Sequence, residues 1–212
     1  MIAHSITDSN QASSMAPKTA LLVVDMQRVF EPMTIKALPN IKKLITHFQS
    51  SSSPIIFTQH GHSEEELTTN PSPNQLVRKW GPDGSIAYGS DDWKFQSEIK
   101  KYVDGSKAGA GASDWPKVVA KNTYDAFINT DLDQILREAC VERAVVCGVM
   151  TDCCCDTTAR SAFNRGFDTW LVSDACGSAN ERQHQAGLRG FEFAFGPVMT
   201  TNEAVVMLKK GE

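Results

Sequence analysis

The sequence lacks the features that would place the protein in a membrane or on a nucleic acid. No apolar stretch approaches the roughly 20 residues that a membrane-spanning helix needs. The first 17 residues are polar and rich in Ser, without the hydrophobic segment of a secretory signal. Lys and Arg number 21 against 25 Asp and Glu, and this net charge of −4 argues against nucleic acid or an anionic membrane as a partner. We therefore expect a cytoplasmic protein with a disordered leader over residues 1–17, with export that needs no signal peptide as an open alternative.

Several patterns for binding nucleotides and metals are also missing. No GxxxxGKS or GxxxxGKT segment occurs, which excludes a P-loop at the level of the motif. Gly109 and Gly111 begin a dinucleotide-like pattern, but Asp114 stands where the third Gly belongs and no strand precedes it. The six Cys include no paired CxxC units of the kind that build a structural zinc site. Free thiols are therefore expected, and no cofactor is predicted.

Short apolar runs alternate with amphipathic segments along most of the chain. The runs are continuous rather than alternating in hydrophobicity, as in parallel strands that are buried on both faces. Strands are predicted at 19–24, 54–59, 117–120, 143–148, 168–173 and 197–200, and helices at 35–49, 93–103, 131–141, 155–165, 179–194 and 202–209. This order predicts a single domain over residues 18–212, a three-layer α/β/α sandwich around a mostly parallel, Rossmann-like sheet of about six strands.

Local signals add two expectations. Capping boxes are predicted at the start of three helices, formed by Thr130 with Asp133, Ser178 with Glu181 and Thr200 with Glu203. The stretch from Gly61 to Gly89 is rich in Pro, Gly, Asn and Ser, and it is too long for a plain connection. A pocket-lining loop or a lid is expected there.

Three polar residues stand at the ends of predicted strands. Asp25 and Lys121 each close an apolar run, and Cys154 comes shortly after another. Ligands of open α/β sheets bind outside the carboxyl ends of the strands, so these side chains could face one crevice. Cys154 would be the nucleophile, Asp25 its general acid–base, and Lys121 the charge that holds both in place. A nearby Lys and a helix N-terminus would lower the pKa of the thiol and favour the thiolate.

Each of these residues also fits a structural role. Asp25 could cap a loop, Lys121 could be a solvated lysine, and Cys154 could be an inert thiol of the core. The catalytic interpretation gains because all three occupy the same kind of position in the predicted sheet.

Four segments in order resemble the isochorismatase-like cysteine hydrolases, a family that includes nicotinamidases, carbamoyl-group amidases and isochorismatases. The segments are Leu21-Leu-Val-Val-Asp-Met-Gln27 with Phe30; Lys121-x-x-Tyr124-x-Ala-Phe127 with Leu132; Gly148-Val-Met-Thr-Asp-x-Cys154 with Thr158-Ala-Arg160; and Asp174-Ala175 with Glu181-x-x-His184. The resemblance covers roughly residues 19–208. It implies the triad Asp25, Lys121 and Cys154, in which the middle thiol of three is chosen by the pattern Thr-Asp-x-Cys.

The resemblance also implies a cis peptide bond before the Thr, which corresponds to Val149–Met150. The backbone N–H groups of Met150 and Cys154 would then form an oxyanion hole. Members of this family usually have a small residue at the position of Met150, so the pocket of this chain is expected to differ in shape.

Nicotinamidases carry a metal site just after the second strand, built as Asp-x-His with further His nearby. This chain has His60 and His62 there, which are expected to be surface or pocket-rim residues, so no metal is predicted. His184 is expected to be a structural histidine. Substrate-pocket residues are predicted to be Phe30, Trp80, Trp93 and Tyr124.

Three functions remain open at this stage. The first is thiol-dependent hydrolysis of a C–N bond in a small amide or ureido compound. The second is hydrolysis of the vinyl ether of isochorismate, which needs acid catalysis and not the thiol, with action as a secreted effector as one variant. The third is a non-catalytic binding protein on the same fold. The partner in the first two is a small molecule, and the family resemblance implies a homodimer or homotetramer.

Overall fold

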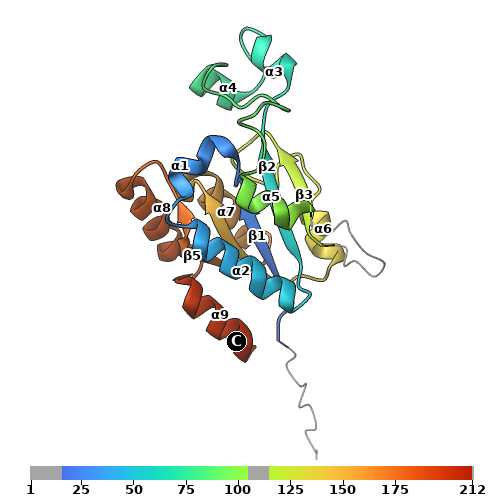
Figure 1. The fold of residues 1–212 in the computed structure, drawn as a ribbon, viewed down its shortest axis with the longest axis vertical. Helices are drawn as coiled ribbons and strands as arrows, with labels where there is room; N and C mark the ends of the chain where they lie inside the picture. Colours follow the sequence, from blue (N-terminus) through green and yellow to red (C-terminus); the bar gives the residue numbers. More distant parts are fainter. Residues whose placement is uncertain (1–15, 105–114, 212) are drawn as a thin grey trace, which may run out of the picture.

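The computed structural model describes residues 16–104 and 115–211, and the described strands form one wholly parallel sheet (Figure 1). The strands are β1 (Thr19–Val24), β2 (Ile55–His60), β3 (Lys117–Lys121), β4 (Arg143–Val149), β5 (Asp168–Gly177) and β6 (Val198–Met199). Their order in the sheet is β3-β2-β1-β4-β5-β6. The chain runs outward from β1 in one direction and from β4 in the other, so the order reverses between β1 and β4. Such a switch point is where open α/β sheets bind ligands.

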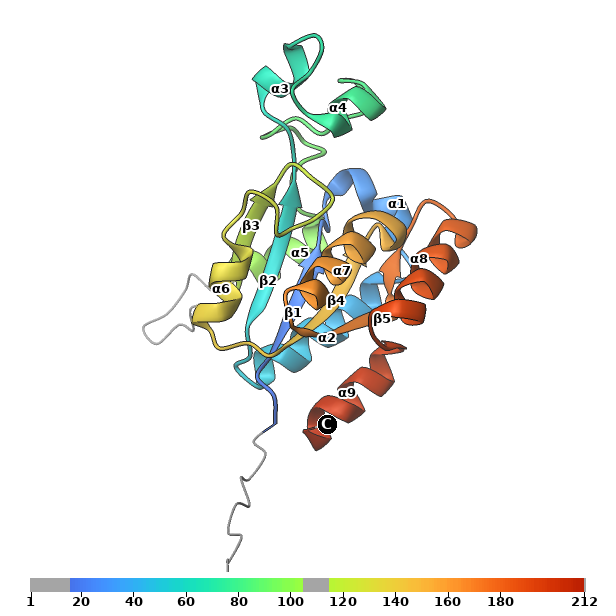
Figure 2. The same cartoon turned by 180° about the vertical axis from the view of Figure 1, so that it is seen from behind.

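Helices cover both faces of the sheet (Figures 1 and 2). They are α1 (Glu31–Thr34), α2 (Leu38–Ser50), α3 (Glu64–Thr68), α4 (Gln75–Trp80), α5 (Ser97–Asp104), α6 (Leu132–Glu138), α7 (Asp156–Asn164), α8 (Glu181–Ala194) and α9 (Thr201–Lys210). Buried residues of α2, α5 and α9 pack on one face, against Leu21 and Val23 of β1. Buried residues of α6, α7 and α8 pack on the other face, against Leu22 and Val24. The predicted three-layer sandwich is therefore confirmed.

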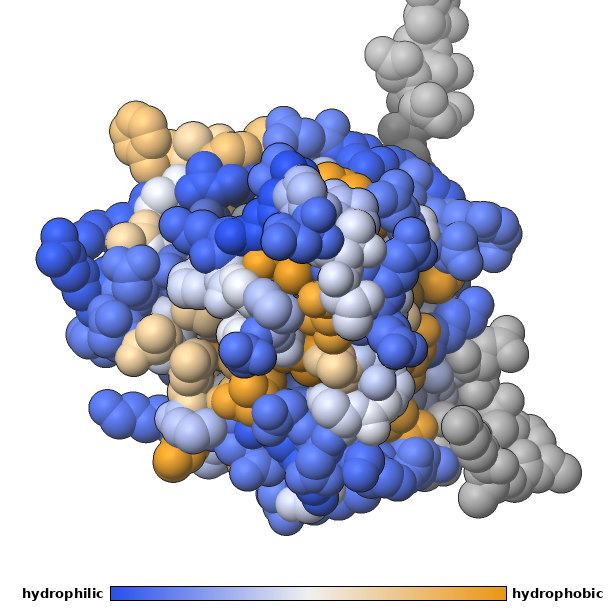
Figure 3. All heavy atoms as spheres, turned by 90° about the horizontal axis from the view of Figure 1, so that it is seen from above, coloured by the Kyte–Doolittle hydropathy of each residue, from blue (hydrophilic) through white to orange (hydrophobic). Residues whose placement is uncertain are grey.

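The segment from Gly61 to Gly89 is more ordered than a loop. It holds α3 and α4, which stand beyond the carboxyl end of β2 and away from the body of the sheet (Figure 1). Ser63 caps α3 through a capping box with Glu66. Figure 3 shows this end of the molecule from above, with hydrophobic residues visible between hydrophilic ones.

Two helix predictions were wrong in their bounds for identifiable reasons. The helix predicted at 35–49 begins only at Leu38, as α2, and the separate short helix α1 precedes it; each has a Pro in its first turn. Pro fits the first turn of a helix but not its interior. The helix predicted at 93–103 begins only at Ser97. The helix predicted at 155–165 is α7, and a π-helical turn at Thr151–Cys155, which was not predicted, precedes it.

Two of the three predicted capping boxes do not form. Thr200 and Glu203 make theirs at the start of α9. Thr130 instead donates to the carbonyl of Ala126. Ser178 donates to Asp152, and Asn180 caps α8 in its place.

Two predictions fall wholly or mostly outside the described residues. The polar leader at 1–17 is described only at Ala16 and Pro17, and the dinucleotide-like pattern from Gly109 to Asp114 is not described. Within the described ranges, no helix is both long enough and apolar enough to cross a membrane.

Candidate active site

The three candidate catalytic residues lie at the carboxyl edge of the sheet. Asp25 directly follows β1, Lys121 is the last residue of β3, and Cys154 lies in the π-helical turn after β4. β1 and β4 are the neighbours at which the strand order reverses. Asp25 and Cys154 therefore flank the expected binding crevice.

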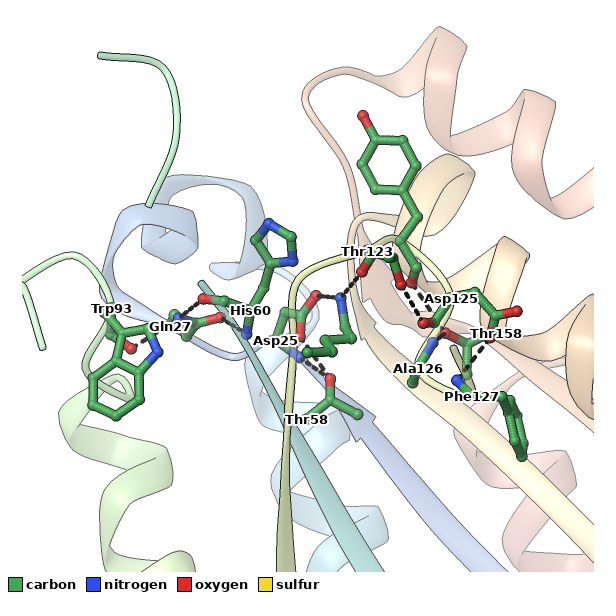
Figure 4. Close-up of polar contacts among 12 residues, drawn as sticks. Asp25, Gln27, Thr58, His60, Trp93, Thr123, Asp125, Ala126, Phe127 and Thr158 are labelled. Carbon is green, nitrogen blue, oxygen red and sulfur yellow. Dashed lines mark hydrogen bonds and ion pairs between the residues drawn. The ribbon is translucent and has the colours of Figure 1, made fainter. Parts of the chain in front are cut away.

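Asp25 and Lys121 form a fully buried ion pair. Lys121 Nζ lies 2.6 Å from Asp25 Oδ2, and both side chains are 0% exposed. Thr58 Oγ1 donates to the other carboxylate oxygen at 2.6 Å, and Lys121 Nζ also donates to the carbonyl of Thr123 at 3.0 Å (Figure 4). Burial opposes the charge of Lys121, but Asp25 and Cys154 raise its pKa above the usual value. The lysine is therefore a cation that is held in one position.

Asp25 has a left-handed backbone conformation with φ 48°. Its backbone N–H donates to Thr58 Oγ1 at 3.1 Å, so the same hydroxyl bonds both the backbone and the carboxylate of Asp25. Asp tolerates this region better than most residues, although it remains uncommon. The sharp turn and the hydroxyl of Thr58 aim the carboxylate at Lys121.

Cys154 adjoins this ion pair and lines a cavity. Its residue exposure is 6%, and the cavity has a volume of about 320 Å³. The thiol hydrogen-bonds to Asp25, and Lys121 hydrogen-bonds to the thiol. Both bonds affect the pKa values of Cys154 and Lys121, so the three groups lie together. Burial raises the pKa of Cys154 first of all, Lys121 lowers it, and Asp25 raises it, with a net increase. The expected lowering of the thiol pKa was wrong, because burial outweighs the lysine.

The neighbouring cysteines differ from Cys154 in their contacts. Cys153 also borders the cavity, but its thiol faces Asp152, and burial together with that carboxylate raises its pKa to about 11. Cys155 is 0% exposed and hydrogen-bonds to Cys176 within the core. Of the three, Cys154 is the thiol that meets Asp25 and Lys121.

The cavity includes three of the four predicted pocket residues. Phe30, Trp80 and Tyr124 line it, and Trp80 Nε1 donates to the hydroxyl of Tyr124 at 2.8 Å. Trp93 is not among the residues that line it. The ring of Trp93 makes an edge contact with Tyr88 at 6.2 Å, and its carbonyl accepts from Gln27 and Gln59.

Several lining residues were not predicted. They are mostly apolar: Val29, Met33, Leu76, Ile86 and Ala179, together with Gly84 and Ser85. Leu76 and Ile86 are among the few aliphatic residues in the stretch from Gly61 to Gly89, and this is the sequence signal that could have identified them.

His60 and His62 line the cavity instead of lying at the surface. They are 8% and 1% exposed, which corrects the expectation of surface or rim residues. The pKa of His60 falls to about 4, because of burial first and then the charge of Lys121, while Asp25 acts in the opposite direction. Burial also lowers the pKa of His62. Both rings are therefore neutral near pH 7. The predicted structural histidine, His184, makes a 2.8 Å contact with the hydroxyl of Thr151.

The two histidines do not make a metal site of the kind expected in nicotinamidases. Within the described ranges, no group of three or more His, Cys, Asp or Glu side chains could hold a metal ion. A catalytic zinc needs three protein ligands besides its water. The residues present do not fit a resident metal.

The peptide bond between Val149 and Met150 is cis, as the resemblance implied. Met150 lines the cavity, and its carbonyl accepts from the N–H groups of Cys153 and Cys155 at 3.1 and 3.0 Å. The oxyanion hole formed by the N–H groups of Met150 and Cys154 stays a prediction.

Comparison with known proteins identifies the family. Residues 19–203 match the isochorismatase domain. Nicotinamidase 3 of Arabidopsis thaliana is 36% identical over 83% of this chain and 81% of its own length. A ureidoacrylate amidohydrolase of Serratia proteamaculans is 28% identical over 88% and 81%. The crystal structure of a cysteine hydrolase from Pseudomonas syringae pv. phaseolicola has a TM-score of 0.74 at 26% identity, covering 92% and 94%. The chain belongs to the isochorismatase family and is a hydrolase of that family.

Proposed function

We propose that this enzyme hydrolyses a small neutral carboxamide, with nicotinamide as the first candidate, through an acyl-enzyme on Cys154. The observation that carries the proposal is the position of the Cys154 thiol, which borders a cavity and adjoins the fully buried pair of Asp25 and Lys121. A thiol beside a general base is an arrangement that nucleophilic acyl transfer uses, and here the buried lysine holds the base in place.

Asp25 moves the protons in both halves of the reaction. Because the resting thiol is protonated, Asp25 takes its proton while the sulfur attacks the amide carbon. Protonated Asp25 then gives this proton to the leaving nitrogen, the C–N bond breaks, and ammonia departs. In the second half Asp25 takes a proton from water, and the hydroxide adds to the thioester. The carboxylic acid product then leaves, and Asp25 returns the proton to the sulfur of Cys154. The ammonium group of Lys121, 2.6 Å from Asp25 Oδ2, holds the carboxylate in place between these transfers.

The lining of the cavity favours a neutral substrate. Among the described residues that line it, there is no Lys or Arg, and the two histidines are neutral at pH 7. Lys121 is already paired with Asp25. Isochorismate and ureido acids carry carboxylates, which would lose their water here without gaining a cationic partner. An aromatic amide instead gains contact with Phe30, Trp80 and Tyr124.

The similarity to a plant nicotinamidase, at 36% identity, supports nicotinamide as the first candidate. The similarity to a ureidoacrylate amidohydrolase is lower, at 28%, and supports amide hydrolysis more generally. Neither relative lends support to the vinyl-ether reaction.

A substrate panel tests the proposal. Purified protein is incubated with nicotinamide, benzamide, a ureido acid and isochorismate, and the products are measured by mass spectrometry. We expect ammonia and nicotinate from nicotinamide, with kcat/KM at least about 100-fold above that for the ureido acid, because an unpaired buried charge costs several kcal/mol. Intact-protein mass should reveal an acyl adduct that the Cys154→Ala variant does not form. Turnover of isochorismate alone, with activity kept in Cys154→Ala, would contradict the proposal.

A further inference from the structure

His60 and His62 are the paired side chains of one cavity wall. His60 is the last residue of β2, and His62 follows two residues later. Their Nε2 atoms lie 3.2 Å apart, and the rings meet edge to face at 4.9 Å. This contact needs an N–H on one ring and a lone pair on the other. Two neutral rings therefore share one proton across it.

Glu66 decides which ring is the donor. Its Oε2 lies 3.4 Å from Nδ1 of His62. A carboxylate only accepts, so it favours the His62 tautomer with the proton on Nδ1. Nε2 of His62 then accepts from His60, and Nδ1 of His60 is left with a lone pair. This nitrogen is buried and makes no hydrogen bond of ordinary length with a described residue; the same holds for Nδ1 of His62, whose carboxylate neighbour at 3.4 Å has no counterpart at His60.

Glu66 is itself held in place. The amides of Asn74 and Asn122 each donate to Oε1 at 2.7 Å, and the backbone N–H of Ser63 donates to Oε2 at 2.9 Å. Burial opposes ionisation, but these hydrogen bonds keep the pKa of Glu66 below its usual value. The direction of the histidine pair is therefore fixed by the folded segment that carries α3 and α4.

We propose that the His60–His62 pair works without a metal and positions the substrate by accepting an amide N–H at Nδ1 of His60. The inference rests on the proposed function, since it assigns the unpartnered acceptor to the carboxamide. A primary amide has two N–H donors, whereas isochorismate has no N–H group. Nicotinamidases use a metal at this place in the chain, and here two histidines and an anchoring carboxylate stand there instead.

Metal binding is tested first, independently of any substrate. The purified protein is treated with a chelator, its metal content is measured by elemental mass spectrometry, and zinc is titrated back by calorimetry. We expect no one-to-one zinc site that depends on both histidines, so that His60→Gln/His62→Gln protein and wild type give the same titration. A stoichiometric zinc site that the double variant loses would overturn the inference, as would activity that the chelator removes and zinc restores.

Positioning is tested by binding. Nicotinamide is titrated into Cys154→Ala protein, which cannot turn it over, and into the same protein carrying Glu66→Gln, His60→Leu or His60→Gln. We expect Kd to rise about 10-fold with Glu66→Gln and with His60→Leu, and less with His60→Gln, whose side-chain oxygen can still accept. Glu65→Gln, at an exposed neighbouring position, is the control and should leave Kd unchanged.

In the active enzyme, Glu66→Gln should raise KM about 10-fold and change kcat by less than about threefold, because it affects positioning and not the reacting groups. Circular dichroism checks that each variant is folded. Folded Glu66→Gln and His60→Leu proteins that bind nicotinamide as tightly as the parent would overturn the inference. If wild type neither binds nor hydrolyses any amide, the proposed function fails, the amide-accepting role of His60 falls with it, and the zinc titration alone decides the metal-free part.

Discussion

Two cavities at the carboxyl edge of the sheet can be compared directly. The one beside Cys154 has a volume of about 320 Å³, and a second, lined by Asp174 and Cys176 among others, has about 560 Å³. Both are bordered by Met33, and each includes a cysteine of 6% exposure. Each also has a nearby aspartate that accepts from a threonine hydroxyl, Thr58 for Asp25 at 2.6 Å and Thr201 for Asp174 at 2.7 Å.

The two cavities differ in the other contacts that their aspartate and cysteine make. Asp25 is completely buried against Lys121 and adjoins the thiol of Cys154. Asp174 is only partly buried, and it serves the start of α9 by accepting from both the N–H and the hydroxyl of Thr201. Cys176 hydrogen-bonds to another thiol, that of Cys155. The larger cavity therefore has satisfied structural groups, and the smaller one has a buried charge next to a nucleophile. Size alone would have pointed to the cavity that lacks this combination.

The largest expected effect compares the two cysteines. Cys154→Ala should lower kcat for the amide substrate by roughly 10⁴-fold or more, because the covalent route is lost. Cys176→Ala removes a thiol of the same exposure from the other cavity and should leave kcat within about twofold. Steady-state kinetics on whichever amide is turned over fastest provides the measurement. Equal losses in both variants would show that the loss reflects damage to the fold and not the nucleophile.

The second comparison uses the two aspartates. Asp25→Asn keeps the shape but cannot take a proton, so kcat/KM should fall by about 10²–10⁴-fold. Asp174→Asn should keep nearly full activity and lower the melting temperature through its weakened bonds to Thr201. If Asp25→Asn is far more damaging than Cys154→Ala, the reaction is acid-catalysed vinyl-ether hydrolysis and not acyl transfer. Turnover near the wild-type rate by Asp25→Asn would exclude both mechanisms.

The sequence was sufficient to locate the edge of the sheet where these residues meet. Asp25 and Lys121 end apolar runs and Cys154 follows one, and polar groups in such positions face the carboxyl edge of a parallel sheet. The layers followed from the same alternation of apolar runs and amphipathic segments. These features are local in sequence or follow from general rules of topology.

What could not be predicted depends on distant partners. Thr130 and Ser178 lose their expected caps because Ala126 and Asp152 offer other hydrogen bonds. Trp93 packs on Tyr88, which is a contact between loop residues. The protonation of Cys154 depends on how deeply it is buried, and the pattern around it does not reveal that depth. Burial and competition for hydrogen bonds are properties of the folded chain.

The third prediction compares two ion pairs with the same 2.6 Å separation. Lys121 and Asp25 are 0% exposed, whereas Lys42 and Glu98 are 34% and 48% exposed. Lys121→Met leaves a buried carboxylate without its partner and should lower the free energy of unfolding by about 3–5 kcal/mol. Lys42→Met should change it little, because water screens the exposed pair. Urea denaturation measures both values. The double variant Asp25→Asn/Lys121→Met should recover part of the loss, and failure to do so would mean that packing of the lysine stem dominates.

The smallest expected effect concerns His60 and acid stability. The pKa of His60 is lowered from 6.5 to about 4 in the folded chain, with His62, Lys121 and Asp25 as its charged or titratable neighbours. The unfolded chain therefore binds the proton at a higher pH than the folded one. This contribution to stability is fully present above pH 6.5 and is lost as the pH falls toward 4, by about 3 kcal/mol in total. A His60→Gln variant should show a flatter dependence of unfolding free energy on pH across this window.

His47→Gln is the control, because His47 lies half-buried on α2, away from the cavity lining, and should flatten the curve less. Parallel curves for wild type and His60→Gln between pH 4 and 6.5 would show that His60 is already charged in the folded protein, and the neutral histidine pair would then be wrong.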